Sequence, residues 1–365
     1  MPTDALMEQL QQRRKGRGAS SNRDGRFETY QHVAEDDGWG VHDGPLAPLH
    51  TTLIEDHSKS IIARNNSPDV PFSQSINPFR GCEHGCIYCY ARPTHTYLGY
   101  SAGLDFETKL LYKPHAAALL RETLAKPGYR CEVITLGANT DAYQPVERKL
   151  QITRALLEVM HASRQPVAIV TKNSLVERDI DLLAEMALQG LVRVSVSLTT
   201  LDNKLGQVME PRASAPHRRV QTIARLSAVG IPVNVSFAPV IPSINDAELE
   251  DVLTKARDAG ALDGTYVLLR LPLEIEDLFK EWLDTHFPLR AEHALARIRD
   301  MRGGKHYESR FGTRMRGRGL FAQLLADRFA LARKRLKFEG MPTLREDLFE
   351  PPRAAGAAQD QLALF

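Results

Sequence analysis

Short apolar runs alternate with stretches of helical periodicity from residue 75 to residue 271. Apolar runs of this length are typical of strands that are buried on both faces of a parallel sheet. The stretches between them place apolar residues on one helical face, as Leu150, Leu156 and Val159 do. The predicted strands are 75–81, 131–137, 166–171, 191–198, 231–240 and 265–271, and the predicted helices are 114–126, 147–163, 175–188, 216–229 and 245–259.

This alternation indicates β-α units joined by right-handed crossovers, which form either an open doubly wound sheet or a partial barrel. Gly190, Gly230 and Gly260 each fall just past a predicted helix, where a left-handed backbone conformation favours glycine. In a barrel of this kind the ligand site lies at the carboxyl ends of the strands. Chemistry-bearing residues are therefore expected at the strand ends.

The regions outside the alternation are more polar. Residues 1–60 carry little apolar periodicity and form a predicted N-terminal basic arm, which is either a solvated or loosely docked segment or a contact for a polyanionic substrate. Residues 61–272 form the predicted barrel domain, 273–350 a helical and basic C-terminal extension, and 351–365 a disordered tail.

Composition places the chain among globular proteins, with 43% hydrophobic and 25% charged residues. A net charge of +2 gives no global attraction to nucleic acid or membrane. No apolar run approaches the roughly 20 residues that cross a bilayer, and the polar N-terminus does not resemble a secretory signal. These features predict a cytoplasmic protein that does not associate with membranes.

Three of the four cysteines, Cys82, Cys86 and Cys89, form a C-x3-C-x2-C spacing directly after the first predicted strand. Crowding of this kind in a reducing compartment indicates metal binding rather than disulfides. Three thiolates on a four-iron cluster would leave one iron without a protein ligand, and an open coordination position is typical of a reactive metal.

A zinc site is the alternative, with His84 or His95 as the fourth ligand of a Cys3His set. Zinc sites more often consist of two paired halves separated by a longer loop, whereas this chain has one compact half. Cys131 stands alone at a strand start and is predicted to be a small buried apolar residue.

The cysteine loop, with Tyr88 directly before the last cysteine and the first of six β-α units before it, resembles the cluster loop of the radical S-adenosylmethionine (SAM) superfamily. The resemblance implies a partial (β/α)6 TIM-like barrel and a [4Fe–4S] cluster on the three cysteines, with S-adenosylmethionine on the fourth iron. It implies reductive cleavage of S-adenosylmethionine to a 5′-deoxyadenosyl radical that abstracts hydrogen from a substrate. It also implies a reducing partner such as flavodoxin or ferredoxin.

Within the superfamily the chain is similar to the spore photoproduct lyase-like branch, whose relatives include proteins of unassigned substrate. Three segments carry this similarity: Cys-Ile-Tyr-Cys-Tyr at 86–90, Gly-Ala-Asn-Thr-Asp-Ala-Tyr-Gln-Pro at 137–145, and Thr-Lys-Asn-Ser-Leu-Val-Glu-Arg-Asp at 171–179. One departure is Ala138, which stands where the lyase has its hydrogen-donating cysteine. The resemblance therefore implies radical initiation, as a lyase or a modification enzyme, and leaves the substrate open.

The resemblance also implies roles for individual residues. Tyr88 and Tyr90 would take part in radical propagation, Thr140 would contact the amino group of S-adenosylmethionine, and Lys172 would contact its carboxylate. A lysine at a strand end is a suitable point charge for a carboxylate.

Two further strands carry polar residues on one face. Ser195 and Ser197 share a face of one strand and either bind a ribose diol or satisfy local backbone, and Asn234 on the next strand is a further candidate for cofactor binding. In the loop after the strand of Ser195, Pro211 and Arg212 are candidates for a contact with an anionic substrate, whereas Asp202 and Glu210 could equally be acids on the loop surface.

Residues 302–337 contain eleven Arg or Lys against two acids. This segment is either a nucleic-acid contact, through phosphates and stacked bases, or a docked helix with a solvated basic end. The sequence thus predicts a radical SAM enzyme that acts on an unidentified substrate, with nucleic acid as one candidate. The alternative is a non-enzymatic zinc- and nucleic-acid-binding protein.

Overall fold

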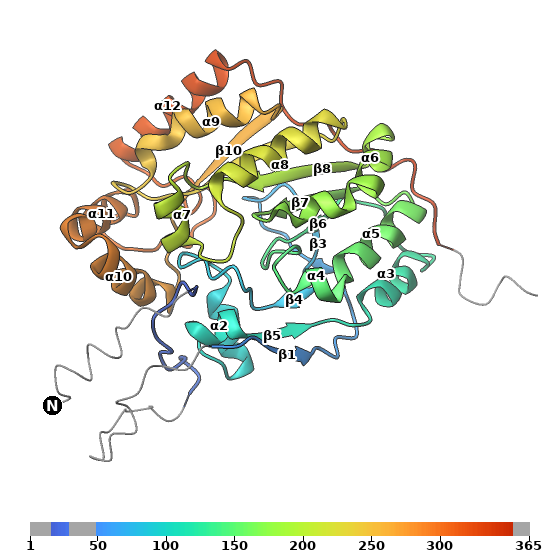
Figure 1. Cartoon of the computed structure of the whole chain (residues 1–365), viewed down its shortest axis with the longest axis horizontal. Helices are drawn as coiled ribbons and strands as arrows, with labels where there is room; N and C mark the ends of the chain where they lie inside the picture. Colours follow the sequence, from blue (N-terminus) through green and yellow to red (C-terminus); the bar gives the residue numbers. More distant parts are fainter. Residues whose placement is uncertain (1–15, 29–48, 353–365) are drawn as a thin grey trace, which may run out of the picture.

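The computed structural model describes residues 16–28 and 49–352 (Figure 1). A seven-stranded sheet forms its centre, with strand order β10-β9-β8-β7-β6-β3-β2. Six of these strands are parallel, and β2 (Ala63–Arg64) pairs antiparallel at the edge. The parallel strands are β3 (Gln74–Ile76), β6 (Ile134–Leu136), β7 (Val167–Thr171), β8 (Val192–Ser197), β9 (Val233–Val240) and β10 (Asp263–Leu268).

The parallel strands lie side by side in chain order. A doubly wound sheet reverses its order at a switch point, whereas a barrel adds each strand next to the preceding one. The sheet is open at both ends, so the predicted partial (β/α)6 barrel is confirmed.

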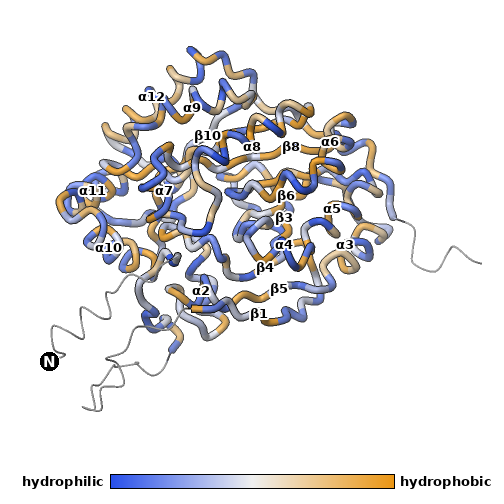
Figure 2. The backbone as a smooth tube through the Cα atoms, viewed as in Figure 1, coloured by the Kyte–Doolittle hydropathy of each residue, from blue (hydrophilic) through white to orange (hydrophobic). Residues whose placement is uncertain are grey.

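Helices cover the outer face of this sheet, and the hydropathy of the chain shows why (Figure 2). Outward residues of β8 such as Val192, Val194 and Val196 belong to the buried core, together with Leu156 and Leu226 of the surrounding helices. The helices between the strands are α3 (Ala116–Leu124), α4 (Glu147–Leu150), α5 (Ile152–Ala162), α6 (Ile180–Leu188), α7 (Asn203–Met209), α8 (Pro216–Ala228) and α9 (Leu249–Asp258). The short 3-10 helices η2 (Ser174–Asp179) and η3 (Asp246–Glu248) precede α6 and α9.

The inner face of the sheet differs from the outer one. Val170, Ser195, Ser236 and Thr265 alternate with buried neighbours and are partly or fully exposed. A closed barrel would fill this space with large aliphatic side chains. Here small and polar residues leave the inner face accessible.

The predicted strand 75–81 is divided in the structure. Pro78 has no N–H for the ladder, and after it the chain leaves the large sheet. β4 (Phe79–Arg80) instead joins β1 (Thr52–Glu55) and β5 (Lys109–Tyr112) in a three-stranded sheet with the order β1-β5-β4, at the lower edge of Figure 1. The cysteine loop therefore follows β4 and leads into the 3-10 helix η1 (Arg92–Leu98) and α2 (Leu104–Thr108).

The C-terminal extension is helical, as predicted. It consists of α10 (Ile275–His286), α11 (Pro288–Met301) and α12 (Leu320–Arg335). Leu325, Phe329 and Ala332 of α12 are buried against the barrel. None of the helices in the described ranges has the length and apolar character to cross a membrane. The domain boundaries stay predictions, and the predicted tail from 353 onward lies outside the described residues.

Residues 16–28 pack between α2 and α10 rather than extending into solvent (Figure 1). The backbone N–H groups of Gly18 and Ala19 donate to the Glu107 carboxylate at 3.0 and 2.9 Å. Ser20 and Ser21 donate to Glu281 of α10. A Cβ at position 18 would lie 1.7 Å from the Gly85 carbonyl oxygen, so glycine is required where this segment crosses the cysteine loop. Arg13, Arg14 and Lys15 lie outside the described residues.

Glu107 also holds the cysteine loop through Arg92. Both side chains are fully buried, and Arg92 Nη2 donates to Glu107 Oε1 at 2.5 Å. Arg92 Nε donates to the Cys86 carbonyl at 2.9 Å, and Nη1 donates to the carbonyls of Ala102 and Gly103. A buried charge is tolerated only when it is paired and hydrogen-bonded, and both conditions are met here.

Glu107→Gln removes the charge that compensates buried Arg92. We expect a loss of about 3 kcal/mol in the free energy of unfolding, because an unpaired buried charge is left behind. Urea unfolding of the full chain measures it. Glu122→Gln, the same substitution at an exposed position of α3, should change the free energy by less than about 0.5 kcal/mol. Equal losses in the two variants would contradict the role of the pair.

Candidate active site

Cys82, Cys86 and Cys89 are free thiols on the loop between β4 and η1. Cys82 and Cys86 are buried and Cys89 is half-buried. Burial raises the pKa of the Cys82 and Cys86 thiols well above the usual range. Thiolate is the metal-binding form, so metal binding at this loop would release protons.

The donor set fits an iron–sulfur cluster. In the part of the chain that the structure describes, no three His, Cys, Asp or Glu side chains converge on a single-ion site. A four-iron cluster binds each thiolate to a different iron, so its three cysteines surround a volume rather than a point. Three free thiols on one short loop supply the type and number of donors for such a cluster, and Cys82, Cys86 and Cys89 are the residues that would hold it.

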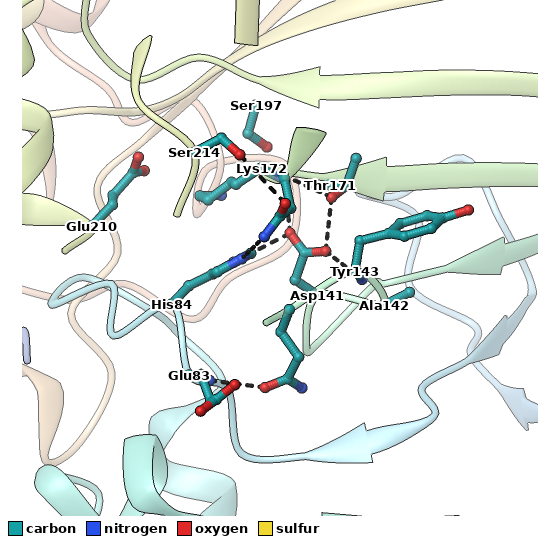
Figure 3. A network of polar contacts seen from close by, with 12 residues as sticks. Glu83, His84, Asp141, Ala142, Tyr143, Thr171, Lys172, Ser197, Glu210 and Ser214 are labelled. Carbon is teal, nitrogen blue, oxygen red and sulfur yellow. Dashed lines mark hydrogen bonds and ion pairs between the residues drawn. The ribbon is translucent and has the colours of Figure 1, made fainter. Parts of the chain in front are cut away.

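His84 ties the loop to the neighbouring strand ends (Figure 3). Its Nδ1 lies 3.4 Å from Asp141 Oδ2, and its Nε2 lies 3.1 Å from the Asn173 side-chain amide. Burial lowers the pKa of His84 to about 4, so the imidazole is neutral at pH 7. The Arg212 N–H donates to the His84 carbonyl. Position 84 is thus engaged on its ring and its backbone.

Asp141 joins the ends of β6 and β7. Its Oδ1 accepts from Thr171 Oγ1 at 2.8 Å and from the Tyr143 N–H at 2.9 Å, and its Oδ2 accepts from the Lys172 N–H at 2.7 Å. The carboxylate therefore fixes the backbone at Lys172, the residue expected to contact S-adenosylmethionine. The Lys172 side chain extends toward the cysteine loop, with its Nζ 5.8 Å from the Tyr88 ring centroid.

Tyr88 and Glu210 form a buried group on the other side of the loop. The Tyr88 hydroxyl and Thr199 Oγ1 donate to Glu210 Oε1, and Arg219 Nη2 donates to Glu210 Oε2. Arg219 also donates to the carbonyls of Ser197 and Ser214. Glu210, which the sequence allowed as an acid on the loop surface, is instead buried in this ion pair.

Arg212 behaves differently from Glu210. Its Nη2 donates to Glu83 Oε1 at 3.1 Å, and it lines a pocket of ≈ 210 Å³. Asn173 and Ser214 also line this pocket, so it lies directly beside the His84–Asp141 network. A cation and two small polar side chains at a strand end are suited to a polar or anionic group.

Tyr90 points in another direction from Tyr88. It is 44% exposed, and its hydroxyl donates to the Ala138 carbonyl at the end of β6. The Arg270 guanidinium lies 5.3 Å from its ring centroid. The two tyrosines that flank Cys89 therefore occupy different environments, Tyr88 in a buried ion-pair group and Tyr90 at the open end of the barrel.

The remaining predicted site residues lie on the strands or at their ends. Thr140 is buried and its hydroxyl donates to the Phe79 carbonyl at 2.8 Å. Ser195 Oγ accepts from Asn234 Nδ2 at 2.7 Å on the inner face of the sheet, and Asn234 Oδ1 is buried without a hydrogen-bond partner. Ser197 is buried. Ser195 and Asn234 are thus brought together, whereas the Thr140 hydroxyl is engaged by backbone.

Several site residues had no role in the sequence-based prediction. Asp141 and Asn173 stand inside the segments 137–145 and 171–179, next to Thr140 and Lys172. Gln144 belongs to the same segment, and its side chain accepts from the Glu83 N–H and donates to the Gly81 carbonyl. Their position as polar residues at a strand end was the signal that could have marked these three as site residues. Arg92 and Arg219 gave no such signal, because both lie in helical segments.

Much of the basic C-terminal stretch is engaged within the fold. Arg314 pairs with Asp69 at 2.5 Å, Arg328 with Glu250 at 2.6 Å, and Arg333 with Asp263 at 2.5 Å. Arg302 is buried. These contacts favour the docked-helix interpretation of 302–337, and nucleic-acid binding stays a prediction.

Known proteins resemble this chain in sequence over part of its length. Residues 76–256 match the Radical SAM superfamily model. An uncharacterized protein of Mycobacterium tuberculosis is 37% identical over 225 residues, which cover 61% of this chain and 66% of that protein. An uncharacterized protein of Methanocaldococcus jannaschii is 26% identical over 213 residues, 58% of this chain and 76% of that protein.

Solved structures of spore photoproduct lyase share the fold. The complex with dinucleoside spore photoproduct has a TM-score of 0.56 at 14% identity and covers 79% of this chain and 80% of that chain. A double mutant of the lyase with bound AdoMet and dinucleoside spore photoproduct has a TM-score of 0.55 at 15% identity, with the same coverage. The cysteine loop, the ordered parallel strands and the match over 76–256 together place residues 76–256 in the radical SAM superfamily, in a chain that shares the fold of spore photoproduct lyase.

Proposed function

We propose that this chain is a radical SAM enzyme that uses a [4Fe–4S] cluster on Cys82, Cys86 and Cys89 to abstract hydrogen from an as yet unidentified substrate. The observation that carries the proposal is the position of the three thiols. They lie on one loop that Arg92, Gln144 and Tyr88 attach to its surroundings at the carboxyl end of the barrel. When bound, the reduced cluster supplies the electron that cleaves S-adenosylmethionine to methionine and a 5′-deoxyadenosyl radical.

Lys172 is the proposed contact for the carboxylate of S-adenosylmethionine. Its backbone is fixed by Asp141, and its side chain lies over the ring of Tyr88, one residue from Cys89. The lysine has no ion-pair partner among the described residues, so its charge is available to a ligand. Ser195, Ser197 and Asn234 are the proposed contacts for the nucleoside, and the unpartnered Asn234 Oδ1 is the acceptor that such a ligand would satisfy. Thr140 is the proposed contact for the amino group of S-adenosylmethionine.

Tyr90 rather than Tyr88 is the proposed participant in hydrogen transfer. Its hydroxyl is beside Ala138, the position at which the lyase-like pattern would have a thiol, and its ring is exposed. Tyr88 instead anchors the loop to Glu210. The absence of a thiol at 138 makes the photoproduct-repair reaction a poor match, and the proposed substrate class is therefore broader than a DNA lesion.

The fold helps to exclude water from this chemistry. The segment 16–28 crosses the cysteine loop, and α10 packs against that segment. Trp282 of α10 also donates to the carbonyl of Val208, close to the loop-anchoring Glu210. A one-electron donor of the flavodoxin or ferredoxin type completes the proposal. The zinc- and nucleic-acid-binding alternative stays a prediction, which the iron and zinc content of the purified protein tests.

Cys86→Ala should abolish cluster binding. Anaerobically reconstituted wild-type protein should hold about four iron per chain, and the variant should lose them together with the 5′-deoxyadenosine formed from S-adenosylmethionine and dithionite. Cys131→Ala is the matched control, because Cys131 lies at the opposite end of β6 and contacts Gln165. It should retain iron and activity. Stoichiometric zinc in the wild type, with no 5′-deoxyadenosine, would refute the proposal.

Lys172→Met should weaken binding of S-adenosylmethionine to the reconstituted protein by about tenfold or more, because one charge-assisted hydrogen bond is lost. Isothermal titration calorimetry measures the dissociation constant. Lys204→Met, at an exposed position of α7, removes the same charge and should leave the constant unchanged. Wild-type affinity in the Lys172 variant would remove this residue from the site, while the iron content would still report on the cluster.

A further inference from the structure

Arg270 follows the last parallel strand, β10, at the carboxyl end of the barrel. Its guanidinium lies 5.3 Å from the ring centroid of Tyr90, which follows Cys89 directly. Tyr90 in turn donates to the carbonyl of Ala138 at the end of β6. Arg270 is therefore beside the cysteine loop, at the point where the loop passes between the ends of an early and the last parallel strand.

The charge of Arg270 has no carboxylate partner among the described residues. Within 16–28 and 49–352, Arg270 donates from Nη1 to the Met315 sulfur at 3.8 Å, which is a weak acceptor, and its Nε is buried without a partner. Asp69 is the acid with which Arg270 interacts electrostatically. The oxygens of Asp69 already accept from the Gly312 N–H at 2.7 Å and from Arg314 Nε at 2.5 Å.

A second guanidinium increases the positive potential at the same place. Arg302 is 1% exposed and donates to the carbonyls of Leu269, Thr313 and Arg314 rather than to an acid. Burial and, to a smaller extent, the positive charge of Arg270 lower the pKa of Arg302 to about 10, against weaker opposite effects of Tyr307 and Glu308. The bond to Leu269 also fixes the backbone directly before Arg270.

We propose that Arg270 binds an oxyanion group of the substrate, a phosphate or a carboxylate, beside Tyr90, with Arg302 as a fixed positive charge behind it. The word substrate rests on the proposed function, whereas anion binding at Arg270 does not. Two adjacent cations are costly without a counter-charge, and the planar donors of a guanidinium match the oxygens of a carboxylate or phosphate. The bound anion supplies the acceptor that the fold does not.

The position of Arg270 gives this anion site a role in positioning. An anion held there would place the substrate next to Tyr90 and in front of the accessible inner face of the sheet, where Thr265 and Val267 of β10 are exposed to solvent fully or in part. The neighbouring cations differ in this respect. Arg314 is neutralised by Asp69, and Arg316 stacks on Tyr266 at 4.0 Å, so Arg270 is the guanidinium of this group that meets the site.

The test is a titration of the full chain with inorganic phosphate and, separately, with acetate, at constant ionic strength in chloride. Binding is measured by calorimetry for the wild type, Arg270→Gln, Arg270→Lys and Arg310→Gln. Arg310 is exposed and lies in the basic segment 302–337, so Arg310→Gln is a control that removes the same charge away from the proposed site. Phosphate, acetate or both should bind to the wild type and to Arg310→Gln with equal affinity. The affinity for Arg270→Gln should be about tenfold lower, and the affinity for Arg270→Lys should lie between the two.

The anion that binds identifies which oxyanion the site prefers. Protection of Arg270 from phenylglyoxal by the same anion, read by mass spectrometry on the wild type, supports the site without any substitution. The proposal is overturned if neither anion binds, if Arg270→Gln binds as the wild type does, or if Arg310→Gln loses as much. These outcomes are independent of iron content and of 5′-deoxyadenosine formation, which test the proposed function.

Discussion

Three largely buried carboxylates surround the cysteine loop, those of Glu107, Asp141 and Glu210, and each of them needs hydrogen-bond donors around it. Glu107 accepts from Arg92 and from two N–H groups of the N-terminal segment. Asp141 accepts from the Thr171 hydroxyl and the Lys172 N–H, and lies beside His84. Glu210 accepts from Tyr88, Thr199 and Arg219. An uncompensated carboxylate in any of these places would be costly, so the loop, the strand ends and the arm are held together.

The same arrangement separates the tasks of residues that stand next to one another in sequence. Tyr88 is committed to Glu210, and Tyr90, two positions later, is exposed beside Ala138 and Arg270. Lys172 has its backbone tied to Asp141 and its side chain left for a ligand. Rigid backbone with available side chains is what a reactive centre requires, because small displacements of reacting groups reduce rates strongly.

The periodicity of the chain was sufficient for the strand-helix units, because each unit follows local rules of apolar spacing and glycine caps, whereas the choice of a partial barrel over a doubly wound sheet came from the resemblance of the cysteine loop. It was insufficient where pairing depends on distant segments. The strand expected at 75–81 divides at Pro78, and its second half pairs with β5, which periodicity did not indicate. Gly18 and Glu107 are 89 residues apart, so their contact has no local signature. The cysteines were singled out by their spacing, their position after the first predicted strand and the adjacent Tyr88, whereas the arginines that contact their loop were indistinguishable from surface cations.

The N-terminal segment binds Glu107 through its main chain, and this has a consequence for divergence. Peptide N–H groups are common to nearly every residue type, so the side chains at 18 and 19 do not encode the contact. Related proteins can therefore vary the side chain at 19 and keep this contact, whereas Arg17, Ser20 and Ser21 hold the segment through their side chains. Position 18 is restricted in another way, since any side chain there meets the Gly85 carbonyl oxygen. A single glycine, at a suitable distance before a three-cysteine loop, would be a better marker of this docking mode than overall similarity in the arm.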